Sequence, residues 1–522
     1  VELINVLFAY LITFEVPIMA LIAYPFPRAL PNIAISGLTL YLRCSPPFVS
    51  RKPEVHSSKI NKILYLLQSF LIWFKKFFFG FKFLSTSIFI APISLWDFNN
   101  FVTENKKVKY LDVILGDLSG IIRGKRIPIA DADKIFKSGV QFCYSTFLLD
   151  TSGYCPDAEG RGFTDGDPDA NYFPVKNTLS MMPWHKDNIA QVLISIQDDS
   201  RYSSIVDPRN VLANVWDSFS TLKLYPRVAF ELEFYLIKTR KKLDEVPSPP
   251  ISKRNKRQAE GTQVYGMSEL DDFYDFLEDI NKFCKIQNIP ASTASSEFAP
   301  GQFEINLNST TDLLKAADDS VLLRRLVKET AVKHGYEATF LSKPYLNEAG
   351  SGMHVHLSLY DKNNLNIFSK NKLKNKYLLH AIAGLQKTMY DSMAIFAPNI
   401  NSYRRFLPDQ FVPVNSSWGP NNRSVAFRIP VSDEESTRIE HRVAGAEANA
   451  YLVLSSILSG IMFGIKNKLT PDKPRIDNAC DNPDKDMPLN INDALVRLEK
   501  SKVLNLSLIH ISEPTRLGMI SY

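Results

Sequence analysis

The segment AFELEFYLI, residues 229–237, constrains the fold more than any other part of the chain. Its apolar and aromatic residues are typical of a buried β-strand, yet it carries Glu231 and Glu233. Successive strand side chains alternate between two faces, so both carboxylates point to the same face. Two buried like charges this close are costly unless a cation lies between them. The segment therefore predicts either a half-exposed strand with a polar face or a strand that binds a cation.

The length and charge of the chain restrict its class. At 522 residues it exceeds a single small core, which predicts two or more domains. The net charge of +6 comes without clustered Lys and Arg interleaved with aromatics, so we expect no nucleic-acid partner. The five cysteines form no CxxC pair and no disulfide-like density, which indicates a reduced, cytoplasmic compartment.

The two ends of the chain differ in composition from its middle. Residues 1–97 contain long hydrophobic runs, but Glu15 and Pro17 interrupt the first run and lysines interrupt the second. We expect this segment to be translated non-coding sequence; a membrane anchor is the alternative interpretation. Residues 506–522 resemble a translated sequencing adapter, so we expect the native C-terminal segment to be absent.

Between these ends, strand-like and helical patterns alternate irregularly. Helical patterns cover residues 209–222, 268–289 and 311–335. Ser268 and Thr311 are the predicted N-caps of the last two helices. The sequence carries no Rossmann or Walker glycine signature, so we expect a large α+β fold rather than a parallel α/β sheet.

Four further segments combine apolar, strand-like sequence with charged side chains. The acids and histidines are Glu297, Glu304, His354, His356 and Glu440, and the arginines are Arg405, Arg423, Arg428, Arg438 and Arg442. Taken singly, a strand histidine is usually a core residue, and an arginine beside a glutamate is usually a structural ion pair. Taken with Glu231 and Glu233, they predict an oxygen-rich site for Mg²⁺ or Mn²⁺, beside arginines that bind phosphate and carboxylate groups. The pattern indicates a two-metal, phosphate-handling site.

These segments resemble the glutamine synthetase family, in the same order along the chain. The motifs SGMHVHLS, APGQFE, NRSVAFRIP and RIEHR carry the resemblance, which covers about residues 98–505 and leaves 1–97 and 506–522 outside it. It implies an α+β fold with an N-terminal β-grasp domain, residues 98–205. A C-terminally truncated catalytic domain follows, residues 206–505, in which helices flank an antiparallel sheet. The resemblance also implies a homo-oligomeric, dodecamer-like ring with active sites between subunits.

The resemblance assigns a role to each matching residue. The implied ligands of a first metal are Glu233, Glu297 and Glu304, and those of a second metal are Glu231, His354 and Glu440. The positions that match ATP contacts are His356, Ser358, Arg428 and Arg438. The positions that match the glutamate pocket are Gly350, Arg405 and Arg442, and those that match catalytic arginines are Arg405, Arg423 and Arg442. This division predicts that Glu231→Gln mainly weakens ATP handling, whereas Glu233→Gln mainly disturbs the glutamate side.

The implied reaction joins glutamate to an amine through γ-glutamyl phosphate, with ATP as a substrate. In ammonia-using members of the family, the segment after the arginine pair that matches Arg404 and Arg405 carries a glutamate that helps to deprotonate ammonium. That position is Phe411 in this sequence, and an apolar ring cannot take a proton. Asp150 is the nearest candidate for the acidic ammonium pocket.

Three other elements bear on the amine. RGKRIP, GDPD and TLSMMPW resemble the γ-glutamylpolyamine (γ-glutamylputrescine) synthetase branch of the family. We therefore expect a polyamine or another organic amine as the acceptor. Ammonia, as in glutamine synthetase itself, and a non-catalytic family member are the alternatives.

Overall fold

The computed structural model describes residues 93–507, except residues 187, 198–205, 243, 263, 370–371 and 409. The interpretations of residues 1–92 and 508–522 as non-coding sequence and adapter therefore lie outside the described residues. Within the part that is described, no helix is long and apolar enough to cross a membrane.

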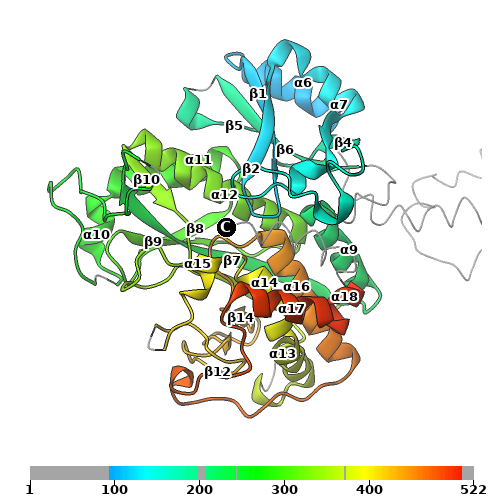
Figure 1. Cartoon of the computed structure of the whole chain (residues 1–522), viewed down its shortest axis with the longest axis vertical. Helices are drawn as coiled ribbons and strands as arrows, with labels where there is room; N and C mark the ends of the chain where they lie inside the picture. Colours follow the sequence, from blue (N-terminus) through cyan, green and yellow to red (C-terminus); the bar gives the residue numbers. More distant parts are fainter. Residues whose placement is uncertain are drawn as a thin grey trace, which may run out of the picture. The chain divides into compact units, whose positions relative to one another are not determined.

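The N-terminal region forms a mixed sheet accompanied by two helices (Figure 1). Its elements are α6 (Leu95–Glu104), β1 (Tyr110–Gly116), β2 (Ile122–Pro128), α7 (Asp133–Ser138), β3 (Val140–Cys143), β4 (Asp169–Pro174), β5 (Ser180–Met181) and β6 (Ile189–Ile196). The sheet order is β2-β1-β6-β4-β3, with β5 beside β6; β1 and β6 run parallel, and the other pairs are antiparallel. The Phe98 and Phe136 rings stack with centroids 4.1 Å apart and join the two helices. The β-grasp assignment and its boundaries stay predictions.

The region predicted to be catalytic, called the catalytic region below, is built on an eight-stranded sheet. Its strands are β7 (Tyr225–Lys238), β8 (Ala291–Ser296), β9 (Gln302–Leu307), β10 (Tyr336–Thr339), β11 (Met353–Tyr360), β12 (Trp418–Pro420), β13 (Phe427–Ile429) and β14 (Ile439–His441). The order is β12-β13-β14-β11-β7-β9-β8, with β10 paired to the end of β7. Apart from the short parallel pair β12–β13, the pairs among these described strands are antiparallel. Buried and half-buried residues alternate from Pro226 to Phe234, as the sequence of this strand predicts.

Helices pack around this sheet and against one another. They are α9 (Pro208–Ser220), α10 (Met267–Asp272), α11 (Tyr274–Ile286), α12 (Leu313–Lys333), α13 (Lys376–Thr388), α14 (Met393–Phe396), α15 (Ile400–Tyr403), α16 (Ala450–Lys466), α17 (Ile491–Lys500) and α18 (Lys502–Ser507). α12 lies between the two sheets (Figure 1): Arg325 Nη2 is 3.5 Å from Asp112 of β1, and the Ser320 hydroxyl is 3.9 Å from the Met353 sulfur of β11. The helix therefore contacts both sheets and supports β11 in the centre of the catalytic sheet.

Glycines allow α13 and α16 to pack closely. A Cβ on Gly384 would lie 2.1 Å from the Gly460 carbonyl oxygen, and a Cβ on Gly464 would lie 2.0 Å from the His380 carbonyl oxygen. Side chains at these positions would push the two helices apart.

The predicted start of the helix at residues 268–289 is wrong. α10 begins at Met267 after Gly266, and no side chain caps it, so the capping box at Ser268 does not form. The helix also breaks at Phe273, which separates α10 from α11. The ring of Phe273 is buried edge-on against Phe303, so a tertiary contact overrides the local helical pattern.

The predicted start of the helix at residues 311–335 is wrong by one residue. Asp312, not Thr311, is the N-cap of α12, and its carboxylate accepts the Lys315 N–H at 3.0 Å. A charged acceptor makes a stronger cap than a hydroxyl. At the other end the helix stops as predicted, because Gly335 takes a left-handed φ of 72°.

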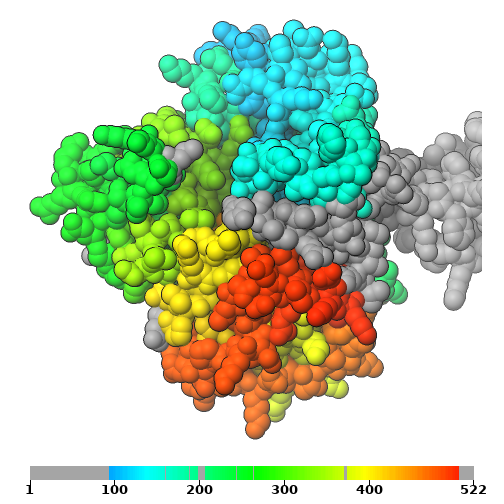
Figure 2. All heavy atoms as spheres, viewed as in Figure 1, coloured from blue at the N-terminus to red at the C-terminus, as the bar shows by residue number. Residues whose placement is uncertain are grey.

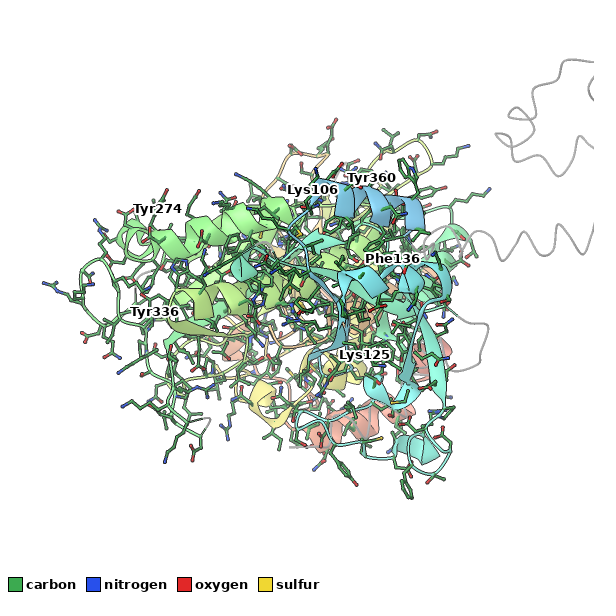
Figure 3. The ribbon with its side chains drawn as sticks, turned by 90° about the horizontal axis from the view of Figure 1, so that it is seen from above. Lys106, Lys125, Phe136, Tyr274, Tyr336 and Tyr360 are labelled. Atoms are coloured by element: carbon green, nitrogen blue, oxygen red, sulfur yellow. The ribbon has the colours of Figure 1, made fainter. Side chains whose placement is uncertain are left out.

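The basic loop between β7 and α10 projects at one edge of the catalytic region (Figure 2). The loop is anchored on β10, because the Tyr336 hydroxyl donates to the Ile251 carbonyl oxygen at 2.9 Å. Tyr336 and Tyr274 lie at this same end of the molecule (Figure 3) and line a cavity of about 510 Å³. The loop is therefore part of the folded catalytic region.

One arginine joins the N-terminal sheet to the catalytic region. The buried guanidinium of Arg324, on α12, donates to the carbonyl oxygens of Ala446 and Ala448 at 3.1 and 3.0 Å. It also donates to the Gly120 carbonyl oxygen, in the turn between β1 and β2, at 3.3 Å. Asn449 Nδ2 donates to the Asp117 carbonyl oxygen at 3.0 Å. The turn is thus fixed to the segment that follows β14.

Candidate active site

The strand register brings the predicted site residues together. Directly opposed residues on neighbouring antiparallel strands have their Cβ atoms about 5 Å apart, so their side chains meet on one face. The opposed pairs are Glu231 with His354, Glu233 with Glu304, His356 with Glu440, and Glu440 with Arg428. Five strands, β7, β9, β11, β13 and β14, therefore supply one cluster of acids, histidines and arginine.

Glu231 lies at the centre of this cluster. Its Oε1 is 2.7 Å from His356 Nε2, and its Oε2 is 3.4 Å from His354 Nδ1. Burial opposes the charge of Glu231, but the contacts with both imidazoles outweigh burial and lower its pKa. The carboxylate is therefore ionised at neutral pH.

Two groups of side chains have the spacing of metal ligands. In each group, the potential ligand atoms all lie within 4.8 Å of one another. The groups are Glu231 with Glu304 and His354, and Glu231 with His356 and Glu440. The family resemblance places His354, rather than His356, with Glu440, and it gives Glu231 to only one ion. The division of ligands between two ions stays a prediction.

The remaining acids show that the cluster fits a cation. Glu233 accepts the Gly352 N–H at 2.7 Å, and Glu304 accepts from Asn306 Nδ2 at 3.2 Å. Burial, and then the neighbouring carboxylates, raise the pKa values of Glu297 and Glu304 well above the ordinary range. A divalent cation would compensate this excess negative charge, and oxygen-rich ligand sets suit Mg²⁺ and Mn²⁺.

Arginines surround the other side of the cluster. Glu440 is 2.7 Å from Arg428 Nη1 and also contacts Arg442 Nη1. Burial opposes the charge of Glu440, but Arg442 and then the two histidines outweigh it and lower its pKa to about 2. Arg438 Nε donates to His356 Nδ1 at 2.9 Å. This arrangement places cations beside the acids, where a phosphate group would need them.

Arg405 is a buried cation beside two close-packed glycines. Its Nη1 donates to the Val443 carbonyl oxygen at 2.7 Å, and its Nη2 donates to the Arg442 carbonyl oxygen at 3.3 Å. Burial lowers its pKa to about 10. A Cβ on Gly350 would lie 2.6 Å from Arg405 Cγ, and a Cβ on Gly352 would lie 2.6 Å from Arg405 Nη2. Both positions therefore require glycine while Arg405 keeps this place.

A cavity of about 420 Å³ opens beside the cluster. It is lined by Glu231 and by three of the predicted ATP contacts, His356, Ser358 and Arg438. Sequence reasoning missed two other lining residues, Arg227 and Tyr360, whose guanidinium and ring lie 4.7 Å apart; Figure 3 labels Tyr360. The spacing within either strand gave no signal for them, because they meet only across the β7–β11 pair.

Arg423, one of the predicted catalytic arginines, interacts with the side chain of Tyr265. Burial opposes the charge of Arg423, but Tyr265 and then Glu440 outweigh it and raise its pKa. Sequence reasoning missed Tyr265, which takes a left-handed φ of 59°. Asp150, the candidate for an ammonium pocket, accepts from the Ser152 hydroxyl at 2.7 Å and from the Tyr154 N–H at 2.8 Å. Its carboxylate thus shapes its own loop.

The family of the chain follows from comparison with known proteins. A family profile described as "Glutamine synthetase, catalytic domain" matches residues 205–510. The chain belongs to the glutamine synthetase family. Family membership confirms the predicted enzyme class, an ATP-dependent carbon–nitrogen ligase, and the glutamine synthetase-type catalytic fold.

Several relatives cover most of this glutamine synthetase-type chain. Gamma-glutamylputrescine synthetase PuuA of Escherichia coli K12 is 41% identical over 388 residues, which span 74% of this chain and 82% of the relative. Glutamate–isopropylamine ligase of a Pseudomonas species is 33% identical over 70% of this chain and 79% of the relative. Glutamine synthetase of Pyrococcus horikoshii is 30% identical over 78% of this chain and 87% of the relative. The predicted resemblance to the γ-glutamylputrescine synthetase branch is confirmed.

The fold matches solved structures as well. A GmaS–ADP complex superposes with a TM-score of 0.68 and 23% identity, covering 80% of this chain and 94% of that chain. GmaS without ligand gives a TM-score of 0.67 with 24% identity, covering 80% and 93%. At this identity the likeness concerns the fold alone.

The raised pKa values of Glu297 and Glu304 predict how this glutamine synthetase-type site responds to pH without metal. A folded pKa above the unfolded value contributes stability that is present at low pH and is lost as the pH rises through the raised values. We expect the melting temperature of the metal-free protein to fall by about 5 °C or more between about pH 5 and pH 9. Saturating Mg²⁺ should remove most of the fall, because the cation replaces the bound protons.

Scanning calorimetry with EDTA or with Mg²⁺ measures this effect. Glu231 and Glu440 have lowered pKa values, so their contribution is lost only in acid, below about pH 4.5, and does not enter this window. Glu304→Gln serves as the control and should flatten the curve of the metal-free protein. A fall of equal size with and without Mg²⁺ would contradict the prediction.

Proposed function

We propose that the protein joins glutamate to an organic amine, with ATP as the energy source and γ-glutamyl phosphate as the intermediate. The observation that carries the proposal is the single cluster around Glu231, in which carboxylates and histidines face Arg428, Arg438 and Arg442. This combination suits a polyphosphate and a carboxylate substrate at one site, because guanidinium groups bind both in bidentate fashion.

The metal ligands we propose are the five acids and one histidine drawn from the family resemblance. They are Glu231, Glu233, Glu297, Glu304, His354 and Glu440. His356 also lies within one of the two potential ligand groups. Bound Mg²⁺ or Mn²⁺ would supply charge compensation for the ATP phosphates and the transferring phosphoryl group. Of these ligands, Glu231 lines the cavity together with His356 and Ser358, so the carboxylates would hold the ions beside that cavity.

The proposed reaction has two steps. A γ-carboxylate oxygen of glutamate forms a bond to the γ-phosphorus of ATP, the bond from that phosphorus to the bridging oxygen breaks, and ADP leaves. The amine nitrogen then attacks the γ-carbonyl carbon, phosphate leaves, and the nitrogen loses a proton to give the amide. We assign Arg405, Arg442 and Gly350 to the glutamate carboxylate, and Arg423 and Arg428 to the phosphoryl oxygens.

An organic amine is the acceptor that the observations favour. Two of the relatives described above are named for putrescine and for isopropylamine. Phe411 stands where the resemblance places a proton-accepting glutamate, and the residue is 62% exposed. Ammonia remains the second candidate, since the Pyrococcus horikoshii relative is a glutamine synthetase. We also propose a cytoplasmic, ring-shaped homo-oligomer with active sites between subunits.

The test measures phosphate release by the full chain in the presence of ATP, glutamate and Mg²⁺. The amines are putrescine, spermidine, isopropylamine and ammonium, each over a range of concentrations. We expect glutamate-dependent release with at least one organic amine at a higher kcat/KM than with ammonium. Absence of release with every amine would contradict a ligase, whereas a preference for ammonium would contradict only the organic amine.

Phe411 offers a sharper test of the amine. Phe411→Glu introduces a proton acceptor at the predicted position, so we expect kcat/KM for ammonium to rise by about tenfold and that for the organic amine to fall. Glutamate would adopt the same left-handed φ, 49°, so the backbone strain is unchanged. Leu407→Glu is the matched control, because Leu407 is 43% exposed on the same segment. Equal effects of the two substitutions would contradict a specific role for position 411.

A further inference from the structure

Glu447 is a carboxylate that none of the assignments above uses. Its Oε2 accepts from the Ser342 hydroxyl at 2.5 Å. Its Oε1 accepts from the Ser402 hydroxyl and, at 3.4 Å, from Asn399 Nδ2. Ser342 and Ser402 are both buried. Hydrogen bonds to a carboxylate are strong and directional, so Glu447 ties two segments of the chain, one at residues 399–402 and one at Ser342, to its own.

The first of these segments carries Arg405. Ser402 lies in α15, and its carbonyl oxygen accepts the Arg405 N–H at 3.2 Å. The Ser402 hydroxyl bound to Glu447 therefore holds the short helix from which the Arg405 side chain starts.

The second segment lies beneath the proposed glutamate pocket. The Ser342 carbonyl oxygen accepts the Ser351 N–H at 2.8 Å. A Cβ on Gly350 would lie 2.9 Å from this same oxygen and 2.6 Å from Arg405 Cγ. Ser342, Gly350 and the stem of Arg405 are thus packed together, and a shift of one displaces the others.

Gly445 provides the space in which Glu447 meets Ser342. A Cβ on Gly445 would lie 2.0 Å from Ser342 Oγ and 2.9 Å from Glu447 Oε2. Any side chain at this position would separate the hydroxyl from the carboxylate. The contact therefore depends on three residues from two distant parts of the sequence.

Arg405 depends on its surroundings for its orientation. Among the described residues, its side-chain hydrogen bonds go to the backbone carbonyl oxygens of Arg442 and Val443. Burial opposes its charge, and the charges of Glu233 and Glu447 favour it. Glu447 thus supports Arg405 both through α15 and through its charge.

We propose that Glu447 is a positioning residue for glutamate binding, which holds Arg405 and Gly350 in place through the hydroxyl groups of Ser402 and Ser342. The proposal rests on the proposed function, because it takes glutamate as the ligand of Arg405. Glu447 acts through these neighbours and does not contact the substrate.

Enzyme kinetics of Glu447 variants test the proposal. We expect Glu447→Ala to raise KM for glutamate by about tenfold to a hundredfold, while kcat and KM for ATP each change by less than about threefold. Glu447→Asp keeps the charge and should recover most of the loss. Ser342→Ala and Ser402→Ala each remove one hydroxyl, so each should raise KM for glutamate by about threefold to tenfold.

Two features separate positioning from simple loss of folding. Asn401 exchanges two hydrogen bonds with the Lys343 backbone, each 2.9 Å long, so α15 keeps a link to the 342–343 segment in the variants. Glu329→Gln is the matched control, because Glu329 is a half-buried glutamate that lines the same cavity, about 450 Å³, as Glu447. It should change KM for glutamate by less than about twofold. Equal rises in KM for glutamate and ATP, a fall in kcat alone, or an equal effect of Glu329→Gln would overturn the proposal.

Direct binding distinguishes this proposal from the proposed function. If the unaltered chain releases no phosphate with any amine, the proposed ligase activity is contradicted, whatever the role of Glu447. Calorimetric titration with glutamate alone then compares the unaltered chain with Glu447→Ala. A weaker affinity of the variant by about tenfold or more supports the positioning role. Equal affinities, or no binding by either protein, would overturn it.

Discussion

Replacing Glu231 by Gln should lower kcat by about a thousandfold or more and weaken the binding of divalent metal. Glu231 belongs to both groups of potential ligands, and its two oxygens face His356 and His354 separately. An amide keeps the size of the side chain but removes the charge and turns one acceptor into a donor. The loss therefore affects both halves of the site.

Steady-state kinetics and titration with Mn²⁺, followed by electron paramagnetic resonance, measure this effect. The division implied by the family resemblance predicts a defect mainly in ATP handling, whereas the shared position of Glu231 predicts defects toward ATP and glutamate together. Glu337→Gln is the matched control, because Glu337 is on β10 of the same sheet and pairs with Arg240 at 2.9 Å. Retention of more than about a tenth of the activity by Glu231→Gln would contradict the prediction.

Replacing Arg405 by Lys should reduce kcat/KM for glutamate by about a hundredfold or more. Arg405 is buried, and its fork reaches the carbonyl oxygens of Val443 and Arg442 together. A single ammonium group cannot bind both oxygens and a substrate carboxylate in the same geometry. One buried carbonyl oxygen would lose its partner, at a cost of about 1–3 kcal/mol in stability.

The neighbouring arginine supplies the control for this substitution. Arg404 is exposed, so Arg404→Lys should change kcat/KM and the melting temperature little. Kinetics with varied glutamate and a thermal unfolding curve for both variants decide the outcome. Similar losses in Arg404→Lys and Arg405→Lys would show that position 405 has no special part.

Periodicity alone located the paired acids and paired histidines. Glu231 and Glu233 are two residues apart on β7, and His354 and His356 are two residues apart on β11, so a strand must place each pair on one face. Which acid faces which histidine depends on the register between strands that are more than 100 residues apart in sequence, and no local pattern encodes it. The grouping of His356, rather than His354, with Glu440 in the structure depends on this register.

Other parts of the site depend on contacts that a single segment does not reveal. Tyr265 reaches Arg423 from a loop with a left-handed residue, and Glu447 meets Ser342 only because Gly445 leaves space for it. The starts of α10 and α12 also differ from their predicted positions, because α10 begins after Gly266 without a side-chain cap and Asp312 caps α12 in place of its neighbour Thr311. Contacts between distant segments therefore determine the Tyr265–Arg423 and Glu447–Ser342 pairs, which local sequence preferences do not reveal.

The hydrogen bonds of Arg324 limit how far the N-terminal sheet and the catalytic region can act as independent modules. The β1–β2 turn, α12 and the segment after β14 share this one guanidinium, together with the Asn449 link. The N-terminal sheet is therefore fixed to the catalytic region, since moving the two apart would strip a buried cation of a partner. A different N-terminal sheet would need a turn that offers the same carbonyl oxygens to Arg324 and Asn449, or compensating changes in the segment that carries Glu447.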